Sequence, residues 1–357
     1  MATKGEETEK REQAILDEII RYYMDRQEAI SARTLSKISS LALSPTTIRN
    51  LMEDLSAEGY LTTEGVARGR IPTQKAFTIF VTRLGVPSPP PQDERPEIPP
   101  MEEGRPPLLP AVLDQVGNYL AAHTGCVALT SLPPRDLYPL DWVRFSAMPQ
   151  GQVLVTLQTR FGDLWSKMLV SPDPFPEDLL REVSRFINET YRNRPLEDIR
   201  GDIMAGEPKE LLAEMPSLGA AFRMLRKAFE WADLPQNRIF GQENLYRIPE
   251  CQGSERLALV HQALHDDEFM HRTLSQGRVV GPGRIAIGTE TGYAGLDRCA
   301  LVGVPFTWRD WQGIVGVLGP MRMDYGLVLS LAAQAATAVS RHLAQATEDI
   351  AASGRPT

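Results

Sequence analysis

The sequence has few cysteines and no long apolar run, and both absences narrow its class. Its three cysteines, Cys126, Cys251 and Cys299, lie far apart and form neither a disulfide framework nor a paired zinc motif. No stretch approaches the roughly 18 consecutive apolar residues of a membrane span. The first residues, MATKGEETEKREQ, lack the apolar core of a signal peptide. We therefore expect a cytoplasmic protein without membrane contact.

An excess of basic charge is also missing. The 357 residues include 38 Lys and Arg against 46 Asp and Glu, a net charge of −8. This balance counts against a uniformly basic nucleic-acid coat protein or a membrane-surface binder, but it does not exclude DNA binding by a local patch. At roughly 100–200 residues per domain, the length indicates two or three domains.

A proline-rich segment marks one domain boundary. Residues 85–110 contain ten prolines in 26 positions, which predicts a semi-rigid extended linker. The block before it, residues 1–84, holds 12 basic and 12 acidic residues. The negative excess therefore lies entirely beyond the first block.

The first block has the pattern of three helices. Apolar residues at helical spacing predict an amphipathic helix from about Glu7 to Asp25. Ser31 is a suitable N-cap for a short second helix, and Ser44-Pro45 opens a third helix that ends before Gly59. The third helix carries an apolar stripe at positions 0, +3, +4 and +7, formed by Ile48, Leu51, Met52 and Leu55.

A two-stranded ribbon is expected after these helices. A short strand at 60–63 precedes a glycine-flanked basic loop at 65–70, and Thr73 can cap a fourth helix from Gln74 to about Leu84. Three helices followed by a ribbon is the winged helix-turn-helix arrangement.

The outward side chains of this unit suit a DNA-binding surface. On the third helix, Arg49 can bind guanine O6 and N7, and Asn50 can bind adenine N6 and N7. Amides and side chains at the start of the second helix can hold a phosphate, and arginines in the wing can follow a groove. The candidate DNA-binding residues are Arg33, Thr34, Lys37, Ser44, Thr46, Thr47, Arg49, Asn50, Arg68 and Arg70. The alternative is an ordinary solvated helix face and a solvated hairpin tip.

The second block is typical of a mixed α+β domain with an insertion. Strands are expected at 127–132, 142–147, 153–159, 164–170, 284–288, 299–307 and 313–318. Helices are expected at about 177–192, 208–231, 253–274 and 325–343. Strands, then helices, then strands again indicate a helical insertion inside one sheet domain. The expected divisions are 111–194 for the first part of that domain, 195–275 for the inserted helical region, 276–347 for the second part and 348–357 for a tail.

Motifs along the whole chain resemble those of one family, the heat-inducible transcription repressor HrcA. The first is Ser31-Ala32-Arg33-Thr34-Leu35, and the second runs from Leu43 to Met52 as LSPTTIRNLM. The others are Gly69-Arg70-Ile71-Pro72-Thr73, the IGTE of 287–290 and the GVLGPMRMDY of 316–325. The resemblance extends from about residue 10 to 345.

The resemblance implies a dimeric bacterial repressor of chaperone operons. Family members bind an inverted-repeat operator called CIRCE in double-stranded DNA, and a GroEL-type chaperonin helps to maintain their active form. It also implies a multidomain α+β fold: an N-terminal winged helix-turn-helix, then a GAF-like sheet domain that carries an inserted dimerising domain. Localisation would be cytoplasmic, at the nucleoid when DNA is bound.

The sequence departs from the family pattern at defined positions. Val66-Ala67-Arg68 stands where the family usually has Thr-Ser-Ala, which removes two hydroxyl groups and adds a charge. Thr289 stands where the family has the first Glu of an IGEE segment.

Other function classes have weaker support in the sequence. His261 and His265 could chelate a metal at i, i+4 spacing, with His271 nearby, but no further ligand is set by local spacing, so we expect no metal site. Gly281-Pro282-Gly283 lacks the strand and helix context of a dinucleotide-binding loop and predicts a turn. We expect no catalytic centre and no cofactor, hence not an enzyme.

Two regions of the second block leave a regulatory role open. At 321–325, Asp324 can cap the last helix while Arg322 pairs with a carboxylate. The GAF-like domain could instead sense a small molecule for another regulon, which requires a roomy pocket with converging polar groups.

Overall fold

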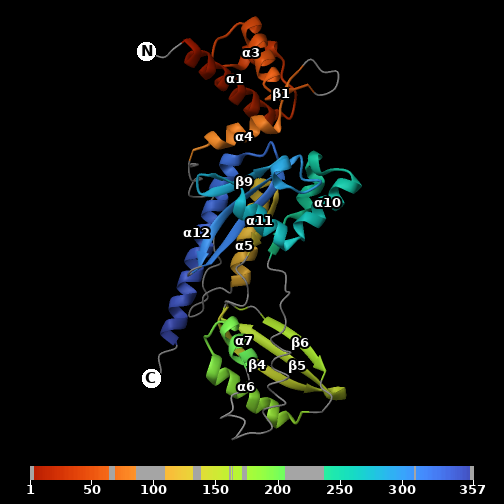
Figure 1. The fold of residues 1–357 in the computed structure, drawn as a ribbon, viewed down its shortest axis with the longest axis vertical. Helices are drawn as coiled ribbons and strands as arrows, with labels where there is room; N and C mark the ends of the chain where they lie inside the picture. The colour runs from red at the N-terminus through yellow and green to blue at the C-terminus, as the bar shows by residue number, and fades with distance from the viewer. Residues whose placement is uncertain are drawn as a thin grey trace.

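The computed structural model shows three units along one axis (Figure 1). A helical N-terminal unit lies at one end, a sheet covered by helices lies in the middle, and a smaller sheet with its own helices lies at the other end. The structure describes residues 4–63, 69–85, 109–131, 138–160, 162, 164–170, 175–205, 237–308 and 311–353.

The N-terminal unit forms around the predicted apolar stripes. Its helices are α1 (Lys4–Arg26), α2 (Ala32–Ile38), α3 (Pro45–Ala57) and α4 (Gln74–Arg83). The four apolar residues of the third-helix stripe are buried, together with apolar residues of α1 and α4. The three predicted capping hydroxyls, those of Ser31, Ser44 and Thr73, each accept a hydrogen bond from a first-turn amide.

A small sheet completes the winged helix. Strands β1 (Leu61–Thr62) and β2 (Ile71–Pro72) pair antiparallel, with Leu61 opposite Pro72. Just before β2, Arg70 forms a bridge with Ile30, which lies ahead of α2. The wing is therefore attached to the start of the second helix by backbone hydrogen bonds.

The middle unit is a six-stranded antiparallel sheet in the order β7-β3-β11-β10-β9-β8. The strands are β3 (Val127–Ser131), β7 (Asn237–Phe240), β8 (Arg278–Val280), β9 (Gly283–Ile287), β10 (Cys299–Trp308) and β11 (Trp311–Pro320). Short 3-10 helices occur at Gln242–Arg247, Pro249–Cys251 and Gly288–Thr291, the last called η6.

Helices cover both faces of this sheet. On one face, α5 (Leu109–Thr124) and α12 (Tyr325–Ser353) share a core with Val302 and Val317. On the other, α10 (Ser254–Leu264) and α11 (Asp267–Gln276) share a core with Leu301 and Leu318. Burial on both faces explains why the central strands are nearly continuous apolar runs.

The third unit is a separate three-stranded sheet. Its strands are β4 (Leu140–Met148), β5 (Gln152–Thr159) and β6 (Leu164–Val170), paired antiparallel in the order β4-β5-β6, with a 3-10 turn at Pro149–Gly151. Helices α6 (Glu177–Tyr191) and α7 (Leu196–Ala205) pack on it and form an independent core.

This third unit corrects the domain division expected from the sequence. We assigned 111–194 to the main sheet domain and 195–275 to a mainly helical insertion. Of the four strands expected in the first range, only β3 joins the six-stranded sheet, and the other three form the separate sheet. The inserted unit thus includes 138–205 and is itself α+β, whereas α10 and α11 pack on the main sheet. The helix expected at 208–231 lies outside the described residues.

The burial pattern gives the physical reason for the difference. β5 alternates strictly between buried and half-buried residues, as a strand with one covered face does, whereas every residue of β3 is buried. Period-2 alternation predicts a strand but does not identify which sheet it joins. The sequence signal that could have separated the two sheets is the difference between strands that are apolar at every position, such as β3, and strands that are apolar at alternate positions, such as β5.

Candidate nucleic-acid interface

Helix α3 presents a polar face away from the rest of the molecule. Ile48 is fully buried, while Thr46, Thr47, Arg49 and Asn50 are all exposed. In Figure 1, α3 lies at the end of the N-terminal unit opposite α4, which contacts the body. The base-reading side chains expected on this helix are therefore accessible to a ligand.

The hydroxyl groups at the start of α3 serve as a helix cap. Ser44 Oγ accepts a hydrogen bond from the Thr47 amide at 3.1 Å and lies 2.8 Å from Thr47 Oγ1. The cap fixes the first turn, and exposed first-turn amides favour an anion such as phosphate.

The start of α2 has the same construction. Ser31 Oγ accepts from the Thr34 amide at 3.1 Å and lies 2.9 Å from Thr34 Oγ1. Arg33, Thr34 and Lys37 are exposed on this helix, and Leu35 is its buried residue. α2 packs against α3, as in a helix-turn-helix.

The base of the wing adds Arg70 to this surface. The Ile30 amide donates to Arg70 O at 3.1 Å, and the Arg70 amide donates to Ile30 O at 2.9 Å. Because Ile30 directly precedes the Ser31 cap, Arg70 lies beside the start of α2. The structure thus brings the candidates of α2, α3 and the wing base together, and Arg68 lies outside the described residues.

Gly69 has a role that the sequence analysis did not identify. A Cβ at this position would lie 2.7 Å from Ala29 Cβ and 2.9 Å from the Ala29 carbonyl carbon. The sequence shows this glycine only as a flank of the basic loop. The structure shows that it allows a close approach between two backbone segments.

The basic residues of the unit divide into those bound within it and those facing solvent. Lys75 Nζ donates to Glu58 O at 2.7 Å and lies over the Tyr60 ring, and Arg83 pairs with Asp17 at 3.3 Å. Burial raises the pKa of the Asp17 carboxyl, and Arg83 opposes that rise. Across the described residues, the candidate cations of α2, α3 and the wing base form no ion pair. They are therefore available to phosphate.

The histidine pattern does not assemble a metal site in the described part of the chain. His265 ends α10 and its Nδ1 lies 2.9 Å from His261 O, whereas His271 lies on α11 with Nδ1 3.1 Å from Ser131 Oγ. No group of three potential ligands is found among these described residues.

Three smaller expectations in the second block are confirmed. Asp324 Oδ1 accepts from the Leu327 amide at 3.0 Å and so caps α12. Arg322 binds Glu250 through two nitrogens, at 2.6 and 3.1 Å. The glycine-proline turn joins β8 to β9 as a hairpin.

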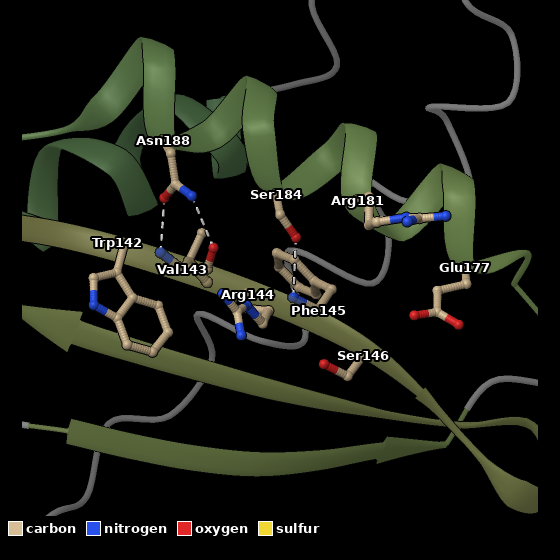
Figure 2. Close-up of a pocket in the computed structure, with 9 residues that line it drawn as sticks. All are labelled: Trp142, Val143, Arg144, Phe145, Ser146, Glu177, Arg181, Ser184 and Asn188. Atoms are coloured by element: carbon tan, nitrogen blue, oxygen red, sulfur yellow. Dashed lines mark hydrogen bonds between the residues drawn. The ribbon is translucent and has the colours of Figure 1, made fainter.

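A pocket of about 490 Å³ lies between β4 and α6 (Figure 2). Asn188 Oδ1 accepts from the Val143 amide at 2.7 Å, and its Nδ2 donates to Val143 O at 3.0 Å. Ser184 Oγ accepts from the Phe145 amide at 3.0 Å. These side chains satisfy the outer backbone edge of β4, which protects an edge strand. The pocket thus lies in the inserted unit.

A transmembrane helix needs about 20 predominantly apolar residues. None of the helices in the described regions combines the length and apolarity needed to cross a bilayer.

Comparison with known proteins identifies similarity over most of the chain. The family model described as "HrcA protein C terminal domain" matches residues 110–329. The heat-inducible transcription repressor HrcA of Methylobacillus flagellatus is 27% identical over 330 residues, covering 90% of this chain and 95% of that protein. The protein of the same name from Geobacter sulfurreducens is 27% identical over 337 residues, covering 94% and 98%.

A solved structure has the same fold. It is described as a hypothetical protein at 2.2 Å resolution, aligns with a TM-score of 0.64 at 19% identity, and covers 94% of this chain and 98% of its own.

Proposed function

The chain belongs to the HrcA family of heat-inducible transcription repressors, a premise from which we propose that it represses heat-shock genes as a dimer bound to a CIRCE-type inverted-repeat operator. Negative regulation of heat-shock transcription is the function of the family, and a transcription repressor is not an enzyme class.

The exposed polar face of α3 is the observation that carries the proposal. Arg49 and Asn50 project from the first half of a helix whose opposite stripe is buried, which is how a recognition helix enters the major groove. Arg33, Lys37 and Arg70 flank it on α2 and the wing base, where they would neutralise phosphates on either side. We infer that the flanking cations position the unit and that α3 reads bases.

The net charge of −8 is compatible with this role. The N-terminal block is neutral overall, so DNA is attracted only where the solvent-facing cations gather. We expect weak non-specific affinity and strong dependence on two sequence-specific contacts made by a dimer.

Binding to an inverted repeat requires two copies of the winged helix, and the inserted unit offers a surface for pairing. The sheet face opposite α6 and α7 exposes Leu164, Met168 and Val170 of β6, at 60%, 44% and 68%. Met168 lies opposite Leu154 of β5 and next to Val170 on the same face, whereas Ser166 separates it from Leu164. Contiguous exposed apolar side chains mark association sites. We propose that a second copy covers this face.

A mobility-shift experiment tests the DNA-binding claim. Purified protein is titrated against a duplex carrying a CIRCE inverted repeat and against a scrambled duplex of equal length and composition. The proposal expects tighter binding to the inverted repeat, and equal affinity for both duplexes would refute specific recognition.

Two arginine variants separate base reading from phosphate binding. Arg49→Ala should relax base discrimination by about 1–3 kcal/mol. Arg70→Ala should weaken binding to all duplexes alike and reduce the slope of log affinity against log salt by about one. Arg181→Ala, an exposed arginine of α6, is the control and should change neither quantity. Intact discrimination in Arg49→Ala would refute the assignment of α3.

Met168→Glu tests the dimer surface. A carboxylate on this face would have to be buried without a partner in the dimer, so sedimentation should show a shift toward monomer. Thr190→Glu, on the exposed side of α6, introduces the same charge elsewhere and should leave the dimer intact. An unchanged dimer in Met168→Glu would place the interface on another surface.

The last part of the proposal concerns release of the repressor from its operator on heating and recovery of operator binding afterwards. Heat would loosen the dimer or the fold, which lowers operator affinity, and a GroEL-type chaperonin would return the repressor to its active form. The check is recovery of operator binding after a heat pulse with and without chaperonin and ATP. Equal recovery in both samples would remove the chaperonin from the proposal.

A further inference from the structure

Helix α4 connects the winged helix to the main sheet through a polar contact. In Figure 1, α4 lies between α1 and α3 on one side and the β9 end of the sheet on the other. Gln74 Oε1 accepts two hydrogen bonds from one residue of η6, from the Thr289 amide at 3.0 Å and from Thr289 Oγ1 at 3.1 Å. These partners are 215 residues apart in the sequence.

A carboxylate joins the same contact from the side of the sheet. Glu290 Oε1 accepts from Thr78 Oγ1 of α4 at 3.3 Å and from Arg278 of β8 at 3.2 Å. Its other oxygen accepts from the Ile287 amide of β9 at 3.2 Å. One side chain therefore ties α4 to two neighbouring strands of the body. We call Gln74, Thr78, Thr289 and Glu290 the α4–η6 joint.

The backbone at Gly288 is shaped for this contact. Its φ of +55° belongs to the left-handed region, and a Cβ there would lie 2.4 Å from Gln74 Oε1. A side chain at this position would strain the turn and displace the glutamine. Gly288 thus permits the approach that the two hydrogen bonds require.

Hydrogen bonds between the winged helix and the main sheet can fix the orientation of one unit on the other, which apolar contacts alone do not. The apolar cores of the winged helix and of the α5–α12 face are continuous, but apolar attraction is non-directional and tolerates rotation. Hydrogen bonds weaken steeply as their angles depart from linearity, so they select one orientation. In a dimeric helix-turn-helix protein, that orientation sets the distance between the two recognition helices and hence the half-site spacing.

We propose that the α4–η6 joint holds the winged helix at one angle on the body and thereby sets the operator half-site spacing that the dimer accepts. Gln74 and Thr289 are positioning residues in this account, because they act through α3 and touch no DNA themselves. The inference rests on the proposed function and adds to it a determinant of operator geometry.

A spacing series tests the joint. Duplexes carry the same two half-sites with the spacer lengthened or shortened by one to three base pairs. Wild type should show one optimum with steep losses on both sides. Gln74→Met removes the accepting oxygen and keeps the side-chain length, so affinity at the optimum should fall about fivefold to tenfold, with smaller losses at the other spacings. Thr289→Val should act in the same direction, since it removes the hydroxyl donor and keeps the shape.

A control variant and two different contrary results separate the role of the joint from the proposed function. Gln13→Met makes the same change on an exposed position of α1 and should keep the wild-type profile. A wild-type profile in Gln74→Met, or an equal loss at every spacing, would overturn the role of the joint. Failure of wild type itself to prefer the inverted repeat over a scrambled duplex would instead overturn the proposed function.

A measurement without DNA gives an independent answer. Spin labels at Glu28→Cys in the winged helix and Glu255→Cys on α10 report the distance between the two units, and the three native cysteines are buried. Labelled protein is diluted into excess unlabelled protein so that each dimer carries one labelled chain. The distance distribution should broaden in Gln74→Met, and an unchanged width would refute the joint.

Discussion

Gly69→Ala should disrupt the base of the wing through a steric conflict. Carbon atoms in ordinary contact are separated by about 3.5–4.0 Å, whereas the new methyl group would lie 2.7 Å from Ala29 Cβ and 2.9 Å from the Ala29 carbonyl carbon. Backbone atoms cannot rotate away as a side-chain end can. The two segments must therefore separate at the bridge between Ile30 and Arg70.

The expected magnitude follows from the contacts that would be lost. Two backbone hydrogen bonds join Ile30 and Arg70, each contributing about 1 kcal/mol, and overpacking adds about 1–3 kcal/mol. We expect Gly69→Ala to lower the free energy of unfolding of the winged helix by about 3–5 kcal/mol. The displaced Arg70 should also reduce the salt dependence of duplex binding, by up to about one unit of slope.

Denaturant unfolding followed by circular dichroism, and duplex titrations at four salt concentrations, measure the two effects. Gly85→Ala is the control, since a Cβ there meets nothing within 4 Å, and it should change stability by less than about 0.5 kcal/mol. Adding Ala29→Gly to Gly69→Ala should recover only part of the loss, because the contact with the Ala29 backbone remains. Stability equal to or above wild type in Gly69→Ala would show that this glycine serves only flexibility.

Three further predictions concern the body of the protein. Gly117→Ala in α5 should destabilise the protein by about 1–3 kcal/mol, because its Cβ would lie 2.1 Å from the Phe240 ring. Gly201→Ala lies in open space on α7 and should stabilise the protein by about 0.5–1 kcal/mol. Melting temperatures of the two variants that shift in the same direction would contradict this pair of predictions. Burial lowers the pKa of His342 below its ordinary value of 6.5, so the unfolded state binds the proton more strongly. Stability should therefore fall as pH drops from above 6.5 through the folded-state pKa, and His342→Leu should flatten that dependence between pH 7.5 and 5.5. Burial raises the pKa of the Cys126 thiol to about 11, so iodoacetamide at pH 8 should modify it only after unfolding, as mass spectrometry would show.

The winged helix could be predicted from the sequence because its signals are local. Ser44-Pro45 marks the start of α3 with a hydroxyl cap and a residue suited to the first turn, and the buried stripe then fixes which face is outward. The exposure of Arg49 and Asn50 follows from that stripe alone. Their contact with DNA stays a prediction.

The arrangement of the sheets could not be predicted in the same way. Whether β4 pairs with β5 in a separate sheet or joins the main sheet depends on contacts between distant segments. The helical pattern at 253–274 likewise gave no indication that the chain breaks near His265 into two helices that both cover the main sheet. Local periodicity identifies elements, and tertiary packing decides their partners.

Parts of the functional surface were also beyond sequence reasoning. The Gln74–Thr289 contact joins residues from different units, and although Thr289 departs from the family pattern, nothing in the sequence indicates that its partner is Gln74. The sequence shows Gly69 only as a flank of the basic loop, and its close approach to Ala29 requires knowing that the wing returns to the start of α2.

The attachment of the inserted unit has a consequence for how such a protein can be built. The chain leaves the main sheet after Ser131 of β3 and returns at Asn237 of β7, and these two residues are directly paired. The roughly one hundred residues between Ser131 and Asn237 therefore connect two adjacent antiparallel strands, a connection that a hairpin turn usually makes. Closing so long a loop instead of a short one adds only a few kcal/mol of chain entropy, because that term grows with the logarithm of length. A tight turn between Ser131 and Asn237 should therefore keep the strand register, and such a variant would lack the β6 face that we propose for pairing.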